Sequence, residues 1–283
     1  MSATPDRRLT PARPDLAAAY LRGRVTAERY VEGAVMEVKE GVVDMRREPR
    51  PDAAVDTQAL YGERVTVYDE EEGWAWAQLA RDGYVGWIGA NTLWSELSAP
   101  THRVCVPRTF VYPAASIKQP PLLALPLSAD VCIVEERDNF LVTRDRGFVW
   151  RTHLAPLDAP AQDFVAVAET LIGAPYLWGG KSVSGVDCSG LVQIALAASG
   201  RKAPRDSDMQ EAELGAPVEP GAPLARGDLV FWKGHVGLMR DPETLLHANG
   251  THMLVSSEPL ALVRARNLEA GAGEVTGVRR LSW

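Results

Sequence analysis

Cysteine is scarce in this 283-residue chain, and long apolar runs are lacking. The three cysteines, Cys105, Cys132 and Cys188, are too few and odd in number for a disulfide framework. The first residues, MSATPDRRLTPARPDLAAAYLRG, lack the apolar core of a signal peptide, and no later stretch is long enough to span a bilayer. We therefore expect a cytoplasmic protein with no membrane partner.

An excess of positive charge is also lacking. The chain has 30 Lys and Arg against 37 Asp and Glu, a net charge of -7, so it has no basic field for a polyanion. This balance argues against a nucleic acid partner. A composition of 46% hydrophobic and 24% charged residues is typical of a packed globular protein, and the length predicts two or three domains.

Short alternating runs separated by Gly, Pro and Asp begin at Val31. GAVMEV, GERVTVY, WAWAQL and GYVGWIG are typical of strands in a small antiparallel barrel. Residues 62–93 can be laid over residues 128–154 as a weak internal repeat, which predicts two copies of the barrel. The proline-rich residues 112–126 are expected to form a loop or an edge of the second copy, because proline cannot donate within a central ladder.

The pattern changes near residue 160. DFVAVAETLIGAPY (163–176) has apolar residues at helical spacing, with a stop at Gly173 and Pro175. DCSGLVQIALAASG predicts a second helix that ends at Gly200, and GDLVFW, HVGLM and THMLVSS follow as strand-like runs. Helices followed by an antiparallel set indicate an α+β domain.

Cys188 lies where the second predicted helix begins. Asp187 is a favourable N-cap, so Cys188 falls in the first helical turn. Unpaired amide N–H groups and the positive end of the helix dipole favour a thiolate at this position, and the same amides can stabilise an oxyanion. We therefore interpret Cys188 as a nucleophile rather than a buried core thiol.

A nucleophilic cysteine needs a base, and two histidines flank the turn RDPET. In a hairpin centred near Asp241, His235 and His247 face each other with Cβ atoms roughly 4.5–5.5 Å apart. One imidazole can act as the base while the other fixes its orientation, as in a papain-like triad. The remaining histidines are expected to be ordinary surface or core residues: His102, His153 and His252.

Four segments carry a resemblance to a known family: YLWGGKSVSGVDCSGLVQIAL, PRDSDMQ, RGDLVFWKGHVGLM and LLHANG, in that order. They resemble the NlpC family of papain-like peptidoglycan peptidases over residues 160–260. The preceding repeats are similar to the bacterial SH3-like domains of one branch, the γ-D-glutamyl-L-diamino-acid endopeptidases, or dipeptidyl-peptidase VI. This resemblance implies cleavage of small murein peptides with a free N-terminal L-Ala, releasing L-Ala-γ-D-Glu.

The resemblance also implies roles for individual residues. Cys188 is the nucleophile, His235 the base and His247 the orienting third residue, while the Tyr176 hydroxyl helps to hold the oxyanion. Asp187 is expected both to cap the helix and to bind the substrate amine, with one carboxylate oxygen for each task. The other residues expected at the substrate are Ser189, Ser207, Tyr84 and Asp56.

The first SH3-like unit is expected to close one end of the cleft through Tyr84, and Asp52 or Asp56 supplies an acid near the amine. Trp74 and Trp87 are expected to be barrel core. A closed cleft with a buried acid would reject peptides whose L-Ala is acylated, because the acid would lose its ammonium partner. This selectivity suits recycling or catabolism of wall peptides.

We therefore expect a multidomain protein with two SH3-like β-barrels followed by a papain-like α+β catalytic domain, needing no metal or organic cofactor. The alternatives are an amidase or acyltransferase on the same scaffold, or a non-catalytic wall-peptide-binding protein. A zinc site is disfavoured because a fourth ligand and a Cys-x-x-Cys pair are lacking. The expected segments are an N-terminal arm (1–30) with a helical turn near 16–21, SH3-like domains (31–100 and 101–157) and the peptidase domain (158–283).

Overall fold

The computed structural model describes residues 5–282, so the first four residues of the predicted arm lie outside it. The chain forms two compact units. One comprises the chain up to Val104 together with Thr109–Leu154, and the other comprises Cys105–Arg108 and the chain from Ala155 onward. Among the described residues, no helix has the length and apolar character needed to cross a membrane.

A seven-stranded sheet in the order β5-β4-β8-β7-β6-β3-β9 builds the first barrel. Its side chains alternate between an apolar inside and a polar outside, as β6 shows with Val65 and Val67 buried and Arg64 exposed. The four runs predicted as strands are strands, and β4 and β5 add to them. The strands are β3 (Ala34–Val38), β4 (Val42–Arg46), β5 (Val55–Leu60), β6 (Arg64–Glu71), β7 (Trp74–Leu79), β8 (Val85–Gly89) and β9 (Leu93–Trp94).

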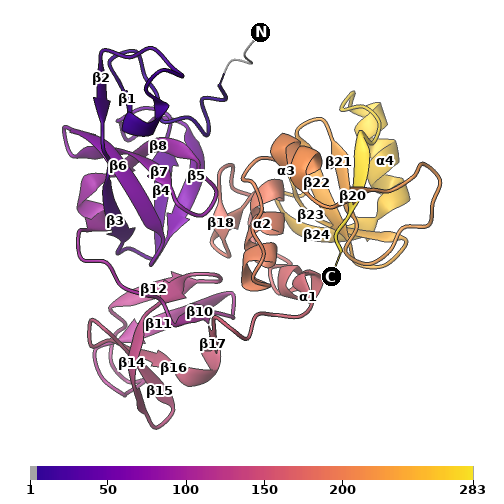
Figure 1. The fold of residues 1–283 in the computed structure, drawn as a ribbon. Coiled ribbons are helices and arrows are strands. Elements are labelled where there is room, and N and C mark those ends of the chain that lie inside the picture. The colour runs from indigo at the N-terminus through magenta and orange to yellow at the C-terminus, as the bar shows by residue number, and fades with distance from the viewer. Residues whose placement is uncertain (1–4, 283) are drawn as a thin grey trace. The chain divides into compact units, whose positions relative to one another are not determined.

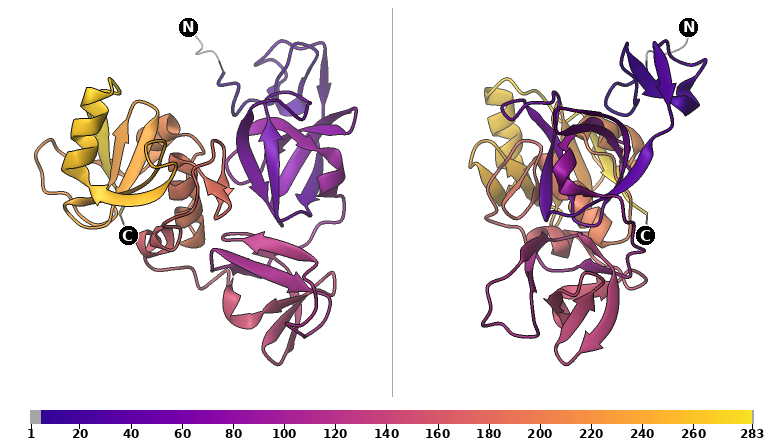
Figure 2. Two further views of the ribbon diagram at one scale, coloured as in Figure 1. Left: turned by 180° about the vertical axis from the view of Figure 1, so that it is seen from behind. Right: turned by 90° about the vertical axis from the view of Figure 1, so that its left-hand side faces the viewer.

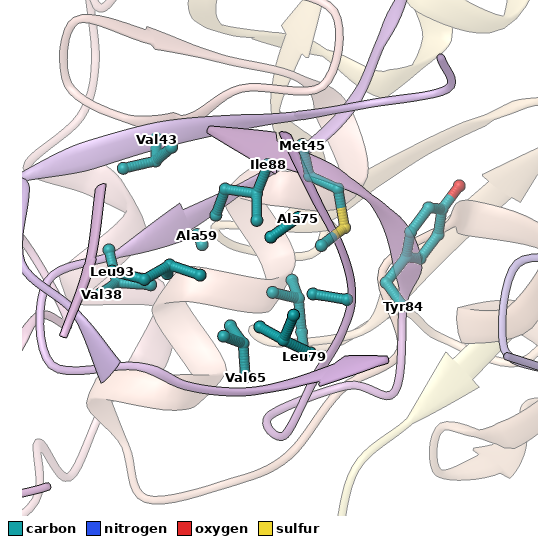
Figure 3. Close-up of a cluster of buried hydrophobic side chains, with 12 residues drawn as sticks. Val38, Val43, Met45, Ala59, Val65, Ala75, Leu79, Tyr84, Ile88 and Leu93 are labelled. Carbon is teal, nitrogen blue, oxygen red and sulfur yellow. The ribbon is translucent and has the colours of Figure 1, made fainter. Parts of the chain in front are cut away.

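The barrel is filled by aliphatic side chains from all of its strands (Figure 3). Met45, Leu79 and Ile88 are almost fully buried there. Figure 3 shows the Tyr84 ring at one end of this cluster, with its hydroxyl directed away from the other side chains. A 3-10 turn, η2 (Ala90–Thr92), links β8 to β9.

The predicted N-terminal arm is packed against the first barrel. It contains β1 (Leu16–Ala18), paired in parallel with β2 (Arg29–Val31), so the predicted helical turn is a strand followed by the 3-10 turn η1 (Ala19–Leu21). Leu16 is fully buried against Trp76 and Trp87. The prediction that Trp87 and Trp74 are barrel core was therefore wrong, since they belong to a separate cluster beneath the arm.

Residues 102–156 form two further sheets, β13-β10-β17 and β12-β11-β16-β15-β14. The meander β14–β15–β16 matches β6–β7–β8 in order, and in both the first two strands change register by a bulge. The prediction for residues 112–126 is confirmed, because they form a loop and the edge strand β12. The elements are β10 (His102–Val104), β11 (Arg108–Tyr112), β12 (Leu123–Pro126), β13 (Asp130–Val131), β14 (Ile133–Arg137), β15 (Phe140–Thr143), β16 (Phe148–Trp150), η3 (Arg151–His153) and β17 (Leu154–Pro156).

The second unit is an α+β fold around a six-stranded antiparallel sheet in the order β20-β25-β21-β22-β23-β24. Figures 1 and 2 show α2 and α4 on opposite sides of this sheet, with Leu260 and Val263 of α4 packed on Val230 and Leu245. The strands are β18 (Lys181–Ser182), β19 (Gly185–Val186), β20 (Ala216–Pro217), β21 (Leu229–Trp232), β22 (His235–Met239), β23 (Thr244–Asn249), β24 (Leu254–Pro259) and β25 (Gly277–Arg280).

Four helices belong to this unit, among the residues that the structure describes: α1 (Phe164–Glu169), α2 (Cys188–Ala198), α3 (Ser207–Glu213) and α4 (Leu260–Glu269). The two predicted helices are present, although α1 ends at Glu169, well before Gly173. The residues after Glu169 continue as tight turns, because the amides of Thr170, Leu171 and Ile172 bond to carbonyls only three residues back. Sequence patterns did not predict α3, α4 or β25.

Candidate active site

Cys188 is the first residue of α2, as predicted, and the turn before it is tightly built. The Asp187 side chain caps the helix by accepting the Gly190 amide at 2.7 Å, and its other oxygen accepts the Gly179 amide at 2.8 Å. A Cβ at position 190 would lie 2.3 Å from the carbonyl oxygen of Gly180. The sequence Cys-Ser-Gly therefore places the sulfur at the helix start while glycine lets the preceding loop approach closely.

Asp187 also forms a buried ion pair with Arg205, a residue that sequence analysis did not single out. The Arg205 Nη1 and Nη2 atoms lie 3.0 Å and 2.6 Å from Oδ1 and Oδ2 of Asp187. The side chain of Arg205 is only 1% exposed. One carboxylate oxygen was predicted to stay available for a substrate amine, but both oxygens are occupied in the structure.

The Cys188 sulfur is buried and accepts hydrogen bonds from the backbone N–H groups of Ser189 and Val236, the second of which follows His235 in the sequence. Burial, together with the Asp187 carboxylate, nevertheless raises the pKa of the Cys188 thiol to about 11, despite these amides and Arg205. The predicted preference for a thiolate is thus outweighed by desolvation. In the free protein Cys188 is a neutral thiol whose proton must leave when it attacks.

The two histidines of the predicted triad contact each other. His235 Nε2 lies 2.9 Å from His247 Nδ1, and the ring centroids are 5.1 Å apart. Strands β22 and β23 pair Leu238 with Leu246, so the hairpin is centred on Pro242 rather than on Asp241, and the two histidines are diagonal rather than direct partners. A Cβ at Gly237, in the same strand as His235, would lie 2.8 Å from the Leu245 side chain, so a larger residue there would displace Leu245.

Both imidazoles are held in their neutral form. Burial, with the nearby His247 and Arg266, lowers the pKa of His235 to about 3. Burial also lowers the pKa of His247, although Glu258 opposes this effect. A neutral imidazole is a competent acceptor for the proton of a neutral thiol, because it has a free lone pair.

Glu258, which sequence analysis missed, is the next group beyond His247. Its Oε1 lies 2.9 Å from His247 Nε2, and Arg266 of α4 binds both of its carboxylate oxygens at 2.7 Å and 2.9 Å. In β24, Ser256 pairs with His247, so Glu258 lies two residues along on the same face. The alternation of THMLVSSEP carried this signal, but nothing in the sequence gave the pairing of β23 with β24.

The other residues predicted at the substrate lie in two places. Tyr176 is half-buried in the turn before β18, and burial together with nearby Cys188 and Asp187 raises its pKa, so its hydroxyl remains a donor. Ser189 is buried, and its Oγ lies 2.9 Å from Arg205 Nη1, while Ser207 begins α3. Tyr176 and Ser189 thus lie at the start of α2, and α3 contacts it through Gln210, whose Nε2 donates to the Ser189 carbonyl.

Tyr84 and Asp56 belong to the other unit. Tyr84 is buried at the end of the barrel core, and Asp56 is paired with Arg47 at 2.6 Å. Asp52, the other acid considered for the amine, is highly exposed and pairs with Arg50. Their predicted contact with a substrate stays a prediction.

The local arrangement suits nucleophilic acyl transfer. Cys188, in the first turn of a helix, has two amides at its sulfur. One of them comes from Val236 of β22, the strand that carries His235, and His235 contacts His247 of the adjacent strand β23. Amide N–H groups at this position can stabilise the negative charge that develops on a carbonyl oxygen under attack. Hydrolysis through a thioester follows from such a constellation.

Comparison with known families gives two matches along the chain. Residues 173–267 match the NlpC/P60 family, and residues 45–93 match the bacterial dipeptidyl-peptidase Sh3 domain. The first match contains Cys188, His235 and His247, and the second covers β5 to β8.

The chain is also 32% identical over 229 residues to the gamma-D-glutamyl-L-lysine dipeptidyl-peptidase of Bacillus subtilis (strain 168), covering 71% of this chain and 74% of that protein. A second relative with the same name, from Bacillus cereus, is 27% identical over 258 residues, covering 80% and 75%. The chain belongs to the NlpC/P60 family. The prediction of a cysteine peptidase of this family, preceded by an SH3-like domain, is therefore confirmed.

A solved NlpC/P60 structure has the same fold. The crystal structure of an NlpC/P60 family protein from Bacillus cereus matches with a TM-score of 0.72 at 22% identity, covering 87% of this chain and 99% of that one. The Sh3 family match ends at residue 93, so it covers part of the first barrel and none of residues 101–157.

Proposed function

We propose that this NlpC/P60 protein hydrolyses the γ-D-glutamyl-L-diamino-acid bond of murein peptides that carry a free N-terminal L-Ala. The observation that carries the proposal is the placement of Cys188 in the first turn of α2, with two amides at its sulfur, one of them from Val236, which directly follows His235 of the His235–His247 pair. The names of the two Bacillus relatives support the bond and the release of a dipeptide.

In the proposed reaction, Cys188 attacks the γ-carbonyl of D-Glu while His235 takes the thiol proton. Amides at the start of α2 and the Tyr176 hydroxyl hold the oxyanion. His235 then gives its proton to the leaving amine of the diamino acid, which leaves a thioester on Cys188. Water loses a proton to His235 and attacks the thioester, and L-Ala-γ-D-Glu departs as the thiol is restored.

The proposal assigns Asp187 and Ser189 to shaping the turn that carries the nucleophile, because both are engaged by Arg205. Ser207, Tyr84 and Asp56 are proposed to bind substrate, following the family resemblance. We further propose that residues 101–157 are a second SH3-like domain, which the repeated meander supports. A cytoplasmic role in recycling or catabolism of wall peptides stays a prediction from the sequence.

The test is mass spectrometry after incubation with L-Ala-γ-D-Glu-diaminopimelate, in parallel with the N-acetylated tripeptide and with Cys188→Ala. We expect L-Ala-γ-D-Glu from the free tripeptide and the unaltered protein only. Cleavage of both peptides would support the peptidase activity but would show that a free N-terminal amine is not required. Transfer of the dipeptide to an added amine in preference to water would indicate an acyltransferase, and binding without turnover would indicate a wall-peptide-binding protein.

A further inference from the structure

A continuous chain of polar contacts leads from His235 into α4. His235 Nε2 is 2.9 Å from His247 Nδ1, and His247 Nε2 is 2.9 Å from Oε1 of Glu258. Glu258 is in turn held by both Nη atoms of Arg266. The partly exposed His252 approaches the other Glu258 oxygen at 3.1 Å, and Ser256 lies 3.4 Å from Oε1.

The chemistry of these groups determines where each proton lies. Arg266 holds the pKa of Glu258 well below its usual range, so the carboxylate only accepts hydrogen bonds. His247 must therefore carry its proton on Nε2. Because His247 is neutral, its Nδ1 is a lone pair that accepts from Nε2–H of His235. His235 is also neutral, so its own Nδ1 is left with a free lone pair.

We propose that Glu258 is a positioning residue which, acting through His247, fixes the tautomer of His235 and makes its Nδ1 the atom that takes the Cys188 proton. The role in catalysis rests on the proposed peptidase function, whereas the tautomers are properties of the free protein. When His235 accepts the thiol proton at Nδ1, its Nε2–H remains bonded to His247, and no second proton moves. The imidazolium is then stabilised through His247 by the carboxylate.

The positive charge of Arg266 balances the negative charge of Glu258. A lone carboxylate beside His247 would favour the doubly protonated imidazolium, which has no lone pair to offer His235. With Arg266 bound to Glu258, the two charges compensate each other, and Glu258 directs the His247 proton without adding another. The groups facing His247 with charge or a titratable proton are thus His235, Glu258, Arg266 and His252.

The first test needs no substrate. Histidine labelled with 15N reports whether each ring nitrogen is protonated, through long-range proton–nitrogen correlations, and His235→Gln and His247→Gln variants assign the two rings. We expect Nε2 protonated and Nδ1 unprotonated in both rings at neutral pH. A His247 ring protonated on Nδ1, or on both nitrogens, would overturn the proposal whatever the activity on the tripeptide.

The second test separates charge from shape. Glu258→Asp keeps a carboxylate but shortens the side chain, whereas Glu258→Gln keeps the shape and loses the charge. We expect kcat on the tripeptide to fall at least about tenfold in Glu258→Gln and Glu258→Ala with KM little changed, and less in Glu258→Asp. The loss should stay below the roughly 10⁴-fold seen when an acid in direct contact with the catalytic histidine becomes an amide.

Glu169→Gln is the matched control, because Glu169 of α1 is also a carboxylate held by arginine, in this case by Arg226 and Arg240, and contacts no histidine of the site. Its kcat should stay within about twofold of the unaltered protein. If Glu258→Gln retains full kcat while Glu258→Asp loses it, Glu258 acts by packing and the proposal is wrong. If these variants fail to fold, the 15N measurement of the histidine tautomers in the unaltered protein still tests the proposal.

Discussion

Arg205 binds both carboxylate oxygens of Asp187, with Nη1 3.0 Å from Oδ1 and Nη2 2.6 Å from Oδ2. The two side chains are buried directly beside the nucleophile Cys188. Asp187 simultaneously accepts amides from Gly179 and Gly190, so one carboxylate joins the loop before α2 to the first turn of the helix. The position of the sulfur therefore depends on an ion pair that no substrate needs to complete.

Removing the Arg205 side chain should lower the free energy of unfolding substantially. Arg205→Met leaves the Asp187 carboxylate buried without its counter-ion, and breaking a buried pair in this way typically costs about 3–5 kcal/mol of unfolding free energy. Arg137→Met is the control, because Arg137 pairs with Glu135 on the surface with both side chains about half exposed, and it should cost at most about 1 kcal/mol. Urea unfolding followed by circular dichroism measures both, and equal losses would contradict the buried-pair argument.

The alkylation rate of Cys188 should rise with pH up to at least pH 9, because the pKa of its thiol is high. Burial raises the pKa of Cys188 to about 11 and lowers that of His235 to about 3, so the neutral pair predominates between these values. In a Cys105→Ser, Cys132→Ser background, the rate with iodoacetamide should rise about tenfold per pH unit from pH 6 to 9, since only the thiolate reacts. A rate that is already constant above pH 6 would indicate a thiolate–imidazolium pair and contradict this assignment.

This pH dependence also limits what alkylation can reveal about function. A slow reaction at neutral pH is expected both of an inert thiol and of Cys188 as the structure places it. Turnover of the tripeptide, rather than thiol reactivity, therefore separates the peptidase from a wall-peptide-binding protein.

Gly190 should not tolerate a side chain. An alanine Cβ there would lie 2.3 Å from the Gly180 oxygen and 2.9 Å from Oδ1 of Asp187, so the loop or the helix start must move. We expect Gly190→Ala to lower the unfolding free energy by about 1–3 kcal/mol and to reduce kcat, because Cys188 shifts with the turn. Gly250→Ala, with no atom within 4 Å of the added Cβ, should be nearly neutral in thermal unfolding. Similar losses in both variants would show that the contact at Gly190 can relax.

Local signals in the sequence were sufficient for the start of α2 and for the strands of the first barrel. A capping Asp187 before an apolar helical stripe places Cys188 in the first turn without tertiary information, and alternation identifies β6 to β8 in the same way. The same reasoning placed His235 and His247 on adjacent strands. It placed the centre of the hairpin at Asp241 instead of Pro242, so the predicted pairing differs from the observed pairing by two residues, and the two histidines are diagonal rather than direct partners.

Contacts between distant segments could not be predicted in this way. Glu258 reaches His247 only because β24 pairs with β23, and Arg266 reaches Glu258 only because α4 folds back onto the sheet. Arg205 looked like an ordinary charge in PRDSDMQ, yet it is almost fully buried. Leu16 likewise gave no sign that it covers Trp87, because a three-residue strand such as β1 has no periodicity to detect.

Arg266 should set the acid limit of activity. Its positive charge lowers the pKa of both His235 and His247, so Arg266→Leu should raise both pKa values. A histidine with a higher pKa is protonated at higher pH and loses the lone pair that accepts the Cys188 proton. The acid limb of the kcat/KM profile should therefore move to higher pH, as measured with the tripeptide.

Arg264→Leu is the control for this shift, because Arg264 is an exposed arginine of the same helix and its loss changes the net charge equally. Its acid limb should coincide with that of the unaltered protein. If Arg264→Leu moves the limb as far as Arg266→Leu does, the effect comes from the overall charge of the unit rather than from the contact with Glu258. If neither variant moves the limb, the acid limit belongs to a group other than the two histidines.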